Sequence, residues 1–182
     1  MANFKEDIAK VKAFIFDVDG VMTDGGIMPI GDGSDFIRKY NAKDGYAVAY
    51  AIKMGYKVIV ISGGRGAILR KRFEHFGVKE LHLDVADKLG CLEEVIARLG
   101  LNRENVIFVG DDIPDLECMQ AVGIPVCPAD SAMEVIEASR YVSEFEGGRG
   151  AVRDIVEQVL RARGDWAKSS EGVTPSSLVA SR

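Results

Sequence analysis

Short apolar runs that end abruptly in polar residues recur three times along the chain and constrain its fold more than any other feature. Each run has four or five residues and is rich in β-branched or aromatic side chains, as expected of strands buried on both faces of a parallel sheet. The runs cover residues 13–16, 57–61 and 105–109, and they end at Asp17, Ser62 and Gly110. Segments with helical spacing lie between them. This alternation predicts an α/β fold, a Rossmann-like three-layer sandwich around a parallel sheet.

Further short strands, helices and one hairpin complete the predicted domain. Two more strands are expected at 123–127 and 140–142, and helices at 44–54, 67–76, 87–99, 113–121, 132–138 and 151–163. Residues 25–40 break the alternation, because two apolar stretches flank a Gly-rich turn, and they predict a β-hairpin after the first strand. We expect residues 1–163 to form a single domain. Residues 164–182 lack periodicity and are expected to form a mobile tail.

Composition and charge narrow the class of protein. The chain has 182 residues, 47% of them hydrophobic, which is enough to bury one ordinary core. Its formal net charge of -5 provides no basic field, so nucleic acid is not expected as a partner. Residues 1–12 contain no apolar segment, and no later stretch approaches the ~18 apolar residues of a membrane span. Cys91, Cys118 and Cys127 lack CxxC spacing, which indicates reduced thiols in a cytoplasmic protein.

Carboxylates gather after two of the predicted strands. Asp17 and Asp19 are separated by one residue and would share a face of an extended strand, where their repulsion favours a bound cation or proton. Asp111, Asp112 and Asp115 follow another strand. The carboxyl ends of parallel strands meet at one edge of a sheet, so these acids are expected to converge. Carboxylate oxygens suit Mg²⁺ better than Zn²⁺.

Two further segments could bind an anion at the same edge. Ser62 and Gly63 lie between a strand and a helix, where a hydroxyl and backbone N–H groups can face a phosphate. Lys88 begins another predicted helix, and taken alone it would be read as a solvated lysine. His75 and His82 lie away from the acidic clusters, so we do not expect an imidazole-rich site.

These clusters, in this order, resemble the four motifs of the haloacid dehalogenase superfamily. The motifs are the acidic box 17–20, Ser62, Lys88, and 110–112 with Asp115, and the resemblance covers about residues 12–163. Response-regulator receivers use similar residues on a similar sheet, but there the acidic pair comes first, a lone phosphoacceptor Asp comes mid-chain and the Lys comes last. The order found here favours the haloacid dehalogenase superfamily.

The resemblance implies a phosphatase mechanism with two working carboxylates. Asp17 would be the nucleophile and form an aspartyl-phosphate, and as a carboxylate it needs no activating base. Asp19 would protonate the leaving oxygen and then deprotonate the attacking water. Asp17, the backbone carbonyl of Asp19 and Asp111 would hold Mg²⁺.

The remaining motif residues are implied to bind phosphate or to orient other groups. Ser62, Gly63 and Lys88 would bind the phosphoryl oxygens. Asp112 and Asp115 would orient the metal-bound waters or Lys88.

The intervals between the motifs hold only the hairpin and one helix–strand unit, so no cap domain is expected. The resemblance is strongest to the capless sugar-acid phosphatases, on the segments 17–25, 43–46 and 147–154. It implies a phosphorylated sugar acid as substrate, with 3-deoxy-D-manno-octulosonate 8-phosphate preferred. It also implies a homotetramer whose packed hairpins let one subunit partly cover the site of another, and a role in cytoplasmic synthesis of lipopolysaccharide precursors.

Several alternatives remain open at the level of sequence. Related enzymes commonly carry a charged residue directly after the Ser/Thr-Gly pair, whereas this chain has Gly64 and then Arg65. Arg65, Arg70 and Arg72 are therefore the candidates for binding the substrate carboxylate. Arg149 or Arg153 could contact the substrate or a neighbouring subunit, although segment 147–150 could simply be a loop that starts a helix. A nonulosonate 9-phosphate phosphatase is a second candidate function. A third is a catalytically silent oligomerisation module, because similar domains are fused to sugar nucleotidyltransferases in some animals.

Overall fold

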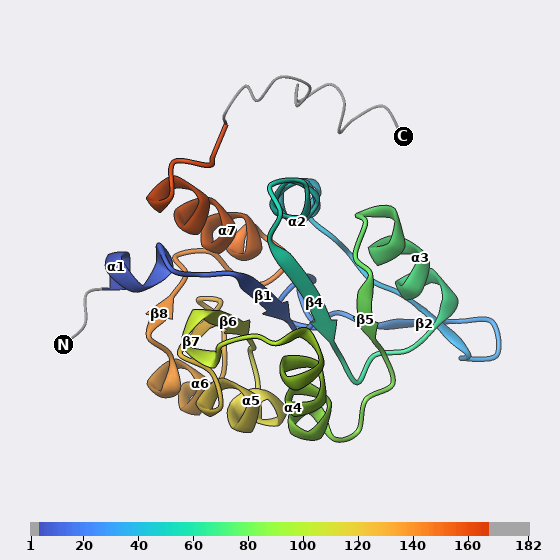
Figure 1. The fold of residues 1–182 in the computed structure, drawn as a ribbon. Helices are drawn as coiled ribbons and strands as arrows, with labels where there is room; N and C mark the ends of the chain where they lie inside the picture. Colours follow the sequence, from blue (N-terminus) through green and yellow to red (C-terminus); the bar gives the residue numbers. More distant parts are fainter. Residues whose placement is uncertain (1–3, 168–182) are drawn as a thin grey trace.

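A six-stranded, fully parallel sheet forms the centre of the molecule (Figure 1). The computed structural model describes residues 4–167. In spatial order the strands are β5 (Glu80–His82), β4 (Lys57–Ile61), β1 (Ala13–Phe16), β6 (Val106–Val109), β7 (Ile124–Cys127) and β8 (Tyr141–Val142). The chain order reverses on either side of β1, and such a switch point opens a crevice at the carboxyl ends of the strands. The predicted α/β sandwich is confirmed.

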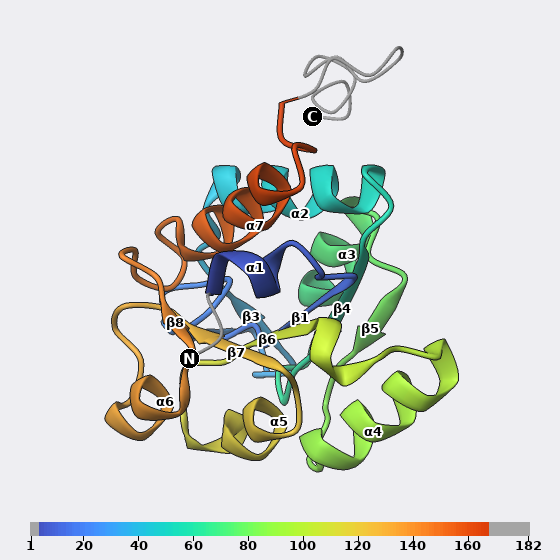
Figure 2. The same cartoon turned by 60° about the vertical axis from the view of Figure 1, so that its left-hand side comes forward.

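Helices cover both faces of the sheet and complete three layers (Figures 1 and 2). One face carries α1 (Phe4–Ile8), α2 (Ala42–Lys53), α3 (Ala67–His75) and α7 (Ala151–Ala162), and the other carries α4 (Lys88–Leu99), α5 (Leu116–Gln120) and α6 (Met133–Ala138). Strand β1 shows why a continuous apolar run is needed. Phe14 and Phe16 pack into the first core, while Ala13 and Ile15 pack into the second, and all four are fully buried.

The predicted hairpin is present and projects beside the sheet. Strands β2 (Met28–Ile30) and β3 (Asp35–Ile37) pair antiparallel across the Gly-rich turn. The pair and the residue before it carry several exposed apolar side chains, namely Ile27, Met28, Ile30 and Ile37. Within residues 4–167 no further domain is inserted after β1 or between β4 and β6, so the chain is capless.

The structure differs from the sequence prediction at a few element ends. Helix α1 was not predicted, and the helix expected at 113–121 is a 3₁₀ turn at Ile113–Asp115 followed by the short α5. Pro114 lies in that first turn, where its missing N–H costs no hydrogen bond. No helix in the described part of the chain is long and apolar enough to cross a membrane.

The start of the predicted tail packs against the domain. The ring of Trp166 lies 5.2 Å from that of Tyr50, and the Tyr56 hydroxyl donates a hydrogen bond to Asp165. These contacts join the chain after α7 to α2 and to the residue that precedes β4. The rest of the predicted tail, residues 168–182, lies outside the described residues.

Candidate active site

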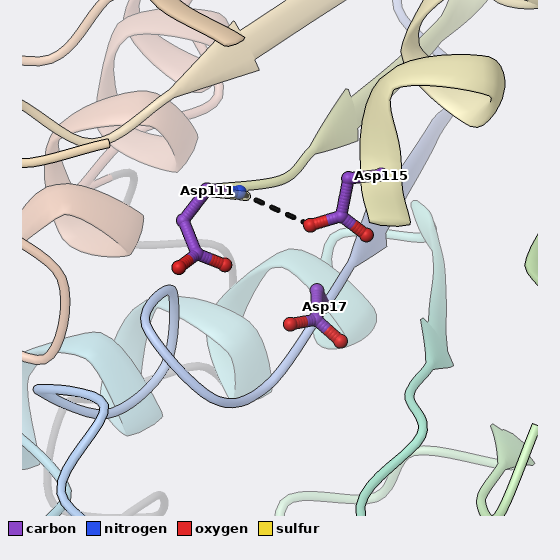
Figure 3. A group of neighbouring side chains, drawn as sticks. All are labelled: Asp17, Asp111 and Asp115. Atoms are coloured by element: carbon purple, nitrogen blue, oxygen red, sulfur yellow. Dashed lines mark hydrogen bonds between the residues drawn. The ribbon is translucent and has the colours of Figure 1, made fainter. Parts of the chain in front are cut away.

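Three aspartates from two strand ends converge on one small space. Asp17 follows β1, and Asp111 and Asp115 follow β6. One carboxylate oxygen of each lies within 4.8 Å of the others. Figure 3 shows the three side chains around a common space. Asp17 is 5% exposed and Asp115 1% exposed, so the cluster is largely withdrawn from water.

Gly20 makes this convergence possible. A Cβ on Gly20 would lie 1.9 Å from the Oδ2 atom of Asp111, and the residue has a φ of 91°, which favours glycine. The loop after β1 can therefore turn back close to Asp111 only because position 20 lacks a side chain.

Lys88 joins two of the three acids. As the first residue of α4, it donates hydrogen bonds from Nζ to Asp17 Oδ1 at 2.9 Å and to Asp115 Oδ1 at 2.7 Å. The other oxygen of Asp115 accepts the backbone N–H of Asp111 at 3.1 Å. Asp115 thus orients Lys88 on one side and the Asp111 segment on the other.

The pKa values show that the cluster carries excess negative charge. Burial raises the pKa of Asp111 to about 8, and the charges of Asp17 and Asp115 add to this effect. Burial and the charge of Asp115 raise the pKa of Asp17 to about 6, against the opposing influence of Lys88. Burial alone would lower the pKa of Lys88, but the charges of Asp17 and Asp115 outweigh it and raise that pKa.

This cluster fits a hard divalent cation. Its donors are carboxylate oxygens, which such ions prefer, and Lys88 offsets only one of the three negative charges. A cation beside Asp17 and Asp111 would favour their ionised forms and reverse both pKa shifts. The residues present are therefore suited to hold a metal such as Mg²⁺.

A cleft of about 450 Å³ opens beside Asp17 and contains the predicted anion-binding residues. Ser62, Gly63 and Lys88 line it together with Asp19. The Ser62 hydroxyl oxygen accepts the Gly64 N–H at 3.0 Å, which fixes the turn after β4. The structure thus brings together the four motifs, although they lie far apart in the sequence.

The carboxylate of Asp19 is paired with Arg38 and is not one of the three clustered acids. Nε and Nη2 of Arg38 donate to its two oxygens at 2.6 and 3.0 Å. Arg38 is not among the site residues expected from the sequence. The only sequence signal was a cation at the end of a short apolar hairpin strand.

The predicted arginines and Asp112 occupy different surroundings. Arg65 is exposed and lines a pocket of about 250 Å³ that shares Asp19 with the cleft. Arg72 does not line either pocket, and its guanidinium packs 4.4 Å from the ring centre of Phe76. Asp112 is exposed and accepts the N–H of the next residue at 2.8 Å.

Arg149 lies in another part of the surface. It pairs with Glu146 at 3.0 Å and lines a separate pocket of about 570 Å³ beside α7. Arg153 lines the same pocket. The structure therefore does not bring Arg149 together with the acidic cluster.

Comparisons with known proteins agree with this geometry. A family model described as haloacid dehalogenase-like hydrolase matches residues 41–123. The chain is thus a phosphoric monoester hydrolase of this class. It is 34% identical to the 3-deoxy-D-manno-octulosonate 8-phosphate phosphatase KdsC of Yersinia pestis over 85% of this chain and 82% of the relative. The chain belongs to the family of these phosphatases.

Solved structures show the same fold. The crystal structure of the phosphatase from Yersinia pestis has a TM-score of 0.84 and 34% identity, and the match covers 88% of this chain and 86% of that one. A structure of the enzyme from Moraxella catarrhalis, in complex with magnesium ion, phosphate ion and a KDO molecule, has a TM-score of 0.84 and 26% identity, covering 89% and 92%.

Proposed function

We propose that this chain is a Mg²⁺-dependent phosphatase whose substrate is 3-deoxy-D-manno-octulosonate 8-phosphate. The observation that carries the proposal is the meeting of Asp17, Asp111 and Asp115 within 4.8 Å, beside the cleft that Ser62 and Lys88 line. The names of the related enzymes support the choice of sugar acid. The ligands named in the Moraxella catarrhalis structure support the choice of metal.

Asp17 is the proposed nucleophile. One of its oxygens forms a bond to phosphorus while the bond from phosphorus to the sugar oxygen breaks, and Asp19 gives a proton to that departing oxygen. Water then attacks phosphorus, the bond to Asp17 breaks with its electron pair returning to the carboxylate, and Asp19 takes the proton of the water. The products are the free sugar acid and inorganic phosphate.

Ser62 and Lys88 are proposed to bind the transferring group. The hydroxyl of Ser62 and the Nζ of Lys88 would contact its oxygens, where negative charge increases in the transition state. Asp115 keeps Lys88 next to Asp17 through its 2.7 Å hydrogen bond. A bound Mg²⁺ would supply Lewis-acid charge neutralisation, and Asp17, the backbone carbonyl of Asp19 and Asp111 are the proposed ligands. Asp112 is a proposed partner of the metal-bound waters.

The open cleft and the exposed hairpin support a homotetramer. Ile27, Met28 and Ile37 are 49%, 63% and 52% exposed, an unusual density of apolar surface on a two-stranded hairpin. We propose that hairpins of neighbouring subunits pack on one another and that a neighbour partly covers each cleft. Arg65, at the cleft edge, is the preferred candidate for the substrate carboxylate.

Residues 1–163 are proposed to act as one catalytic domain in the cytoplasm, in the synthesis of lipopolysaccharide precursors. The names of the related enzymes support the phosphatase activity that this role requires.

The test is phosphate release from a panel of phosphorylated sugar acids, with and without Mg²⁺. We expect the eight-carbon 8-phosphate to be hydrolysed with the highest kcat/KM, and EDTA to abolish the activity. A nonulosonate 9-phosphate is assayed in parallel. A higher kcat/KM for this nine-carbon substrate would replace the eight-carbon sugar acid as the assigned substrate. Absence of Mg²⁺-dependent release from every sugar phosphate would support the silent oligomerisation module instead.

A further inference from the structure

Arg38 is a buried cation that holds both oxygens of the Asp19 carboxylate. Its side chain is 3% exposed, against 22% for Asp19. The two hydrogen bonds, from Nε to Oδ1 at 2.6 Å and from Nη2 to Oδ2 at 3.0 Å, form a fork. Such a fork fixes the plane of a carboxylate as well as its position. Asp19 therefore cannot rotate without losing two charge-assisted hydrogen bonds.

The turn after β4 is built around this pair. A Cβ on Gly64 would lie 3.1 Å from Nη2 of Arg38 and 3.2 Å from Oδ2 of Asp19. Both distances are shorter than ordinary van der Waals contact, so a side chain at this position would press on the pair. Related enzymes commonly have a charged residue where this chain has Gly64. The absence of a side chain at this position leaves room for the guanidinium of Arg38, which comes from the hairpin.

The fork favours one of the two proposed roles of Asp19. In the first half-reaction the sugar oxygen that takes the proton is already held by its bond to phosphorus. In the second half-reaction the attacking water has no such bond, so a carboxylate held in a fixed position matters more there. We infer that Arg38 positions Asp19 as the proton acceptor of the second half-reaction, in which water hydrolyses the phosphate on Asp17. This inference rests on the proposed function. In that step the water proton passes to Asp19, the bond from Asp17 to phosphorus breaks, and inorganic phosphate leaves.

Arg38→Met tests this inference through a split between kcat and kcat/KM. Loss of a positioned base lowers kcat by about 10- to 100-fold. KM falls in parallel, so kcat/KM stays within about threefold, because kcat/KM reports only the steps up to departure of the sugar. The phosphoenzyme accumulates and is detected by intact-protein mass spectrometry after acid quench. With slow hydrolysis of a common intermediate, kcat becomes equal for an alkyl and an aryl phosphate.

Three variants complete the experiment. Arg38→Lys keeps the buried charge but cannot form the fork, so it gives a smaller kcat loss of the same kind. In an Asp19→Asn background, Arg38→Met causes no further loss of kcat, because Arg38 acts only through the carboxylate that Asp19→Asn removes. Lys39→Met, at an exposed neighbour, leaves kcat and KM unchanged. Circular dichroism confirms that each variant is folded.

The outcomes separate this inference from the proposed function. If kcat and kcat/KM of folded Arg38→Met or Arg38→Lys fall together without a rise in phosphoenzyme, Arg38 does not act on the second half-reaction and the inference is wrong. If the wild-type protein itself forms no phosphoenzyme on Asp17, the proposed mechanism fails first.

Discussion

Lys88 lies 2.9 Å from Asp17, although 71 positions separate the two residues in the chain. The contact joins the beginning of α4 to the end of β1, at the edge where the acidic cluster lies. Lys88 is thus placed to stabilise the buried acids and also to bind a phosphoryl group. These two roles have different consequences for stability and for catalysis, and they can be separated by experiment.

Lys88→Met is expected to lower both the stability of the metal-free protein and the rate of catalysis. The free energy of unfolding without metal falls by about 3 kcal/mol, because the buried carboxylates of Asp17 and Asp115 lose their shared cation. Saturating Mg²⁺ restores part of this loss in urea denaturation, while kcat stays reduced by about 10²- to 10³-fold. Lys71→Met, at an exposed position on α3, serves as the control. Unchanged kcat in Lys88→Met would exclude a role in phosphoryl binding.

Asp111→Asn is expected to raise the stability of the metal-free protein while it abolishes activity. Removing one of three crowded negative charges raises the stability of the metal-free protein at pH 8 by about 1 kcal/mol, or about 2–4 °C in Tm. The increase in Tm on adding Mg²⁺ disappears, and activity is lost. Differential scanning fluorimetry measures both effects, with Glu134→Gln on α6 as the control. A full Mg²⁺ response in Asp111→Asn would exclude Asp111 as a ligand.

The raised pKa values predict how stability depends on pH. Asp111 and Asp17 have folded pKa values of about 8 and about 6, above the ordinary value of 3.8. The folded protein therefore binds more protons than the unfolded chain between these limits. In the metal-free protein, the contribution of these two groups to the free energy of unfolding is greatest below pH 3.8. This contribution is lost as the pH rises to about 8. The stabilisation by Mg²⁺ grows over the same range, because the metal competes with the protons.

This pH dependence is checked by thermal unfolding across the same range with and without Mg²⁺. The Asp111→Asn variant should show a flatter pH dependence than the wild type without metal. An equally steep decrease in both proteins would mean that other groups cause it.

Met28→Lys is expected to weaken assembly through the hairpin. A charge on this 63% exposed apolar residue would be buried without a partner between packed hairpins. Sedimentation velocity should show a shift toward monomers, with circular dichroism unchanged and KM increased. Met133→Lys, at a 66% exposed methionine on α6, should leave the assembly intact. An unchanged oligomer in Met28→Lys would place the interface elsewhere.

The sequence was sufficient to predict the sheet and the cluster at its edge, for a physical reason. The apolar run before Asp17 can be buried only inside a two-sided sheet, and the polarity that ends each run marks the carboxyl edge. The contact between Arg38 and Asp19 could not be predicted, because it depends on how the hairpin is oriented against the sheet. Helical spacing likewise did not reveal that the guanidinium of Arg72 packs on an aromatic ring.

The most direct test of the account is to locate the covalent phosphate. The protein is mixed with the sugar-acid phosphate and Mg²⁺, quenched in acid within one turnover and digested for peptide mass spectrometry. The account predicts a phosphate adduct on Asp17 in the wild type and no adduct anywhere in Asp17→Asn. An adduct on another residue, or steady phosphate release by Asp17→Asn at the wild-type rate, would contradict it.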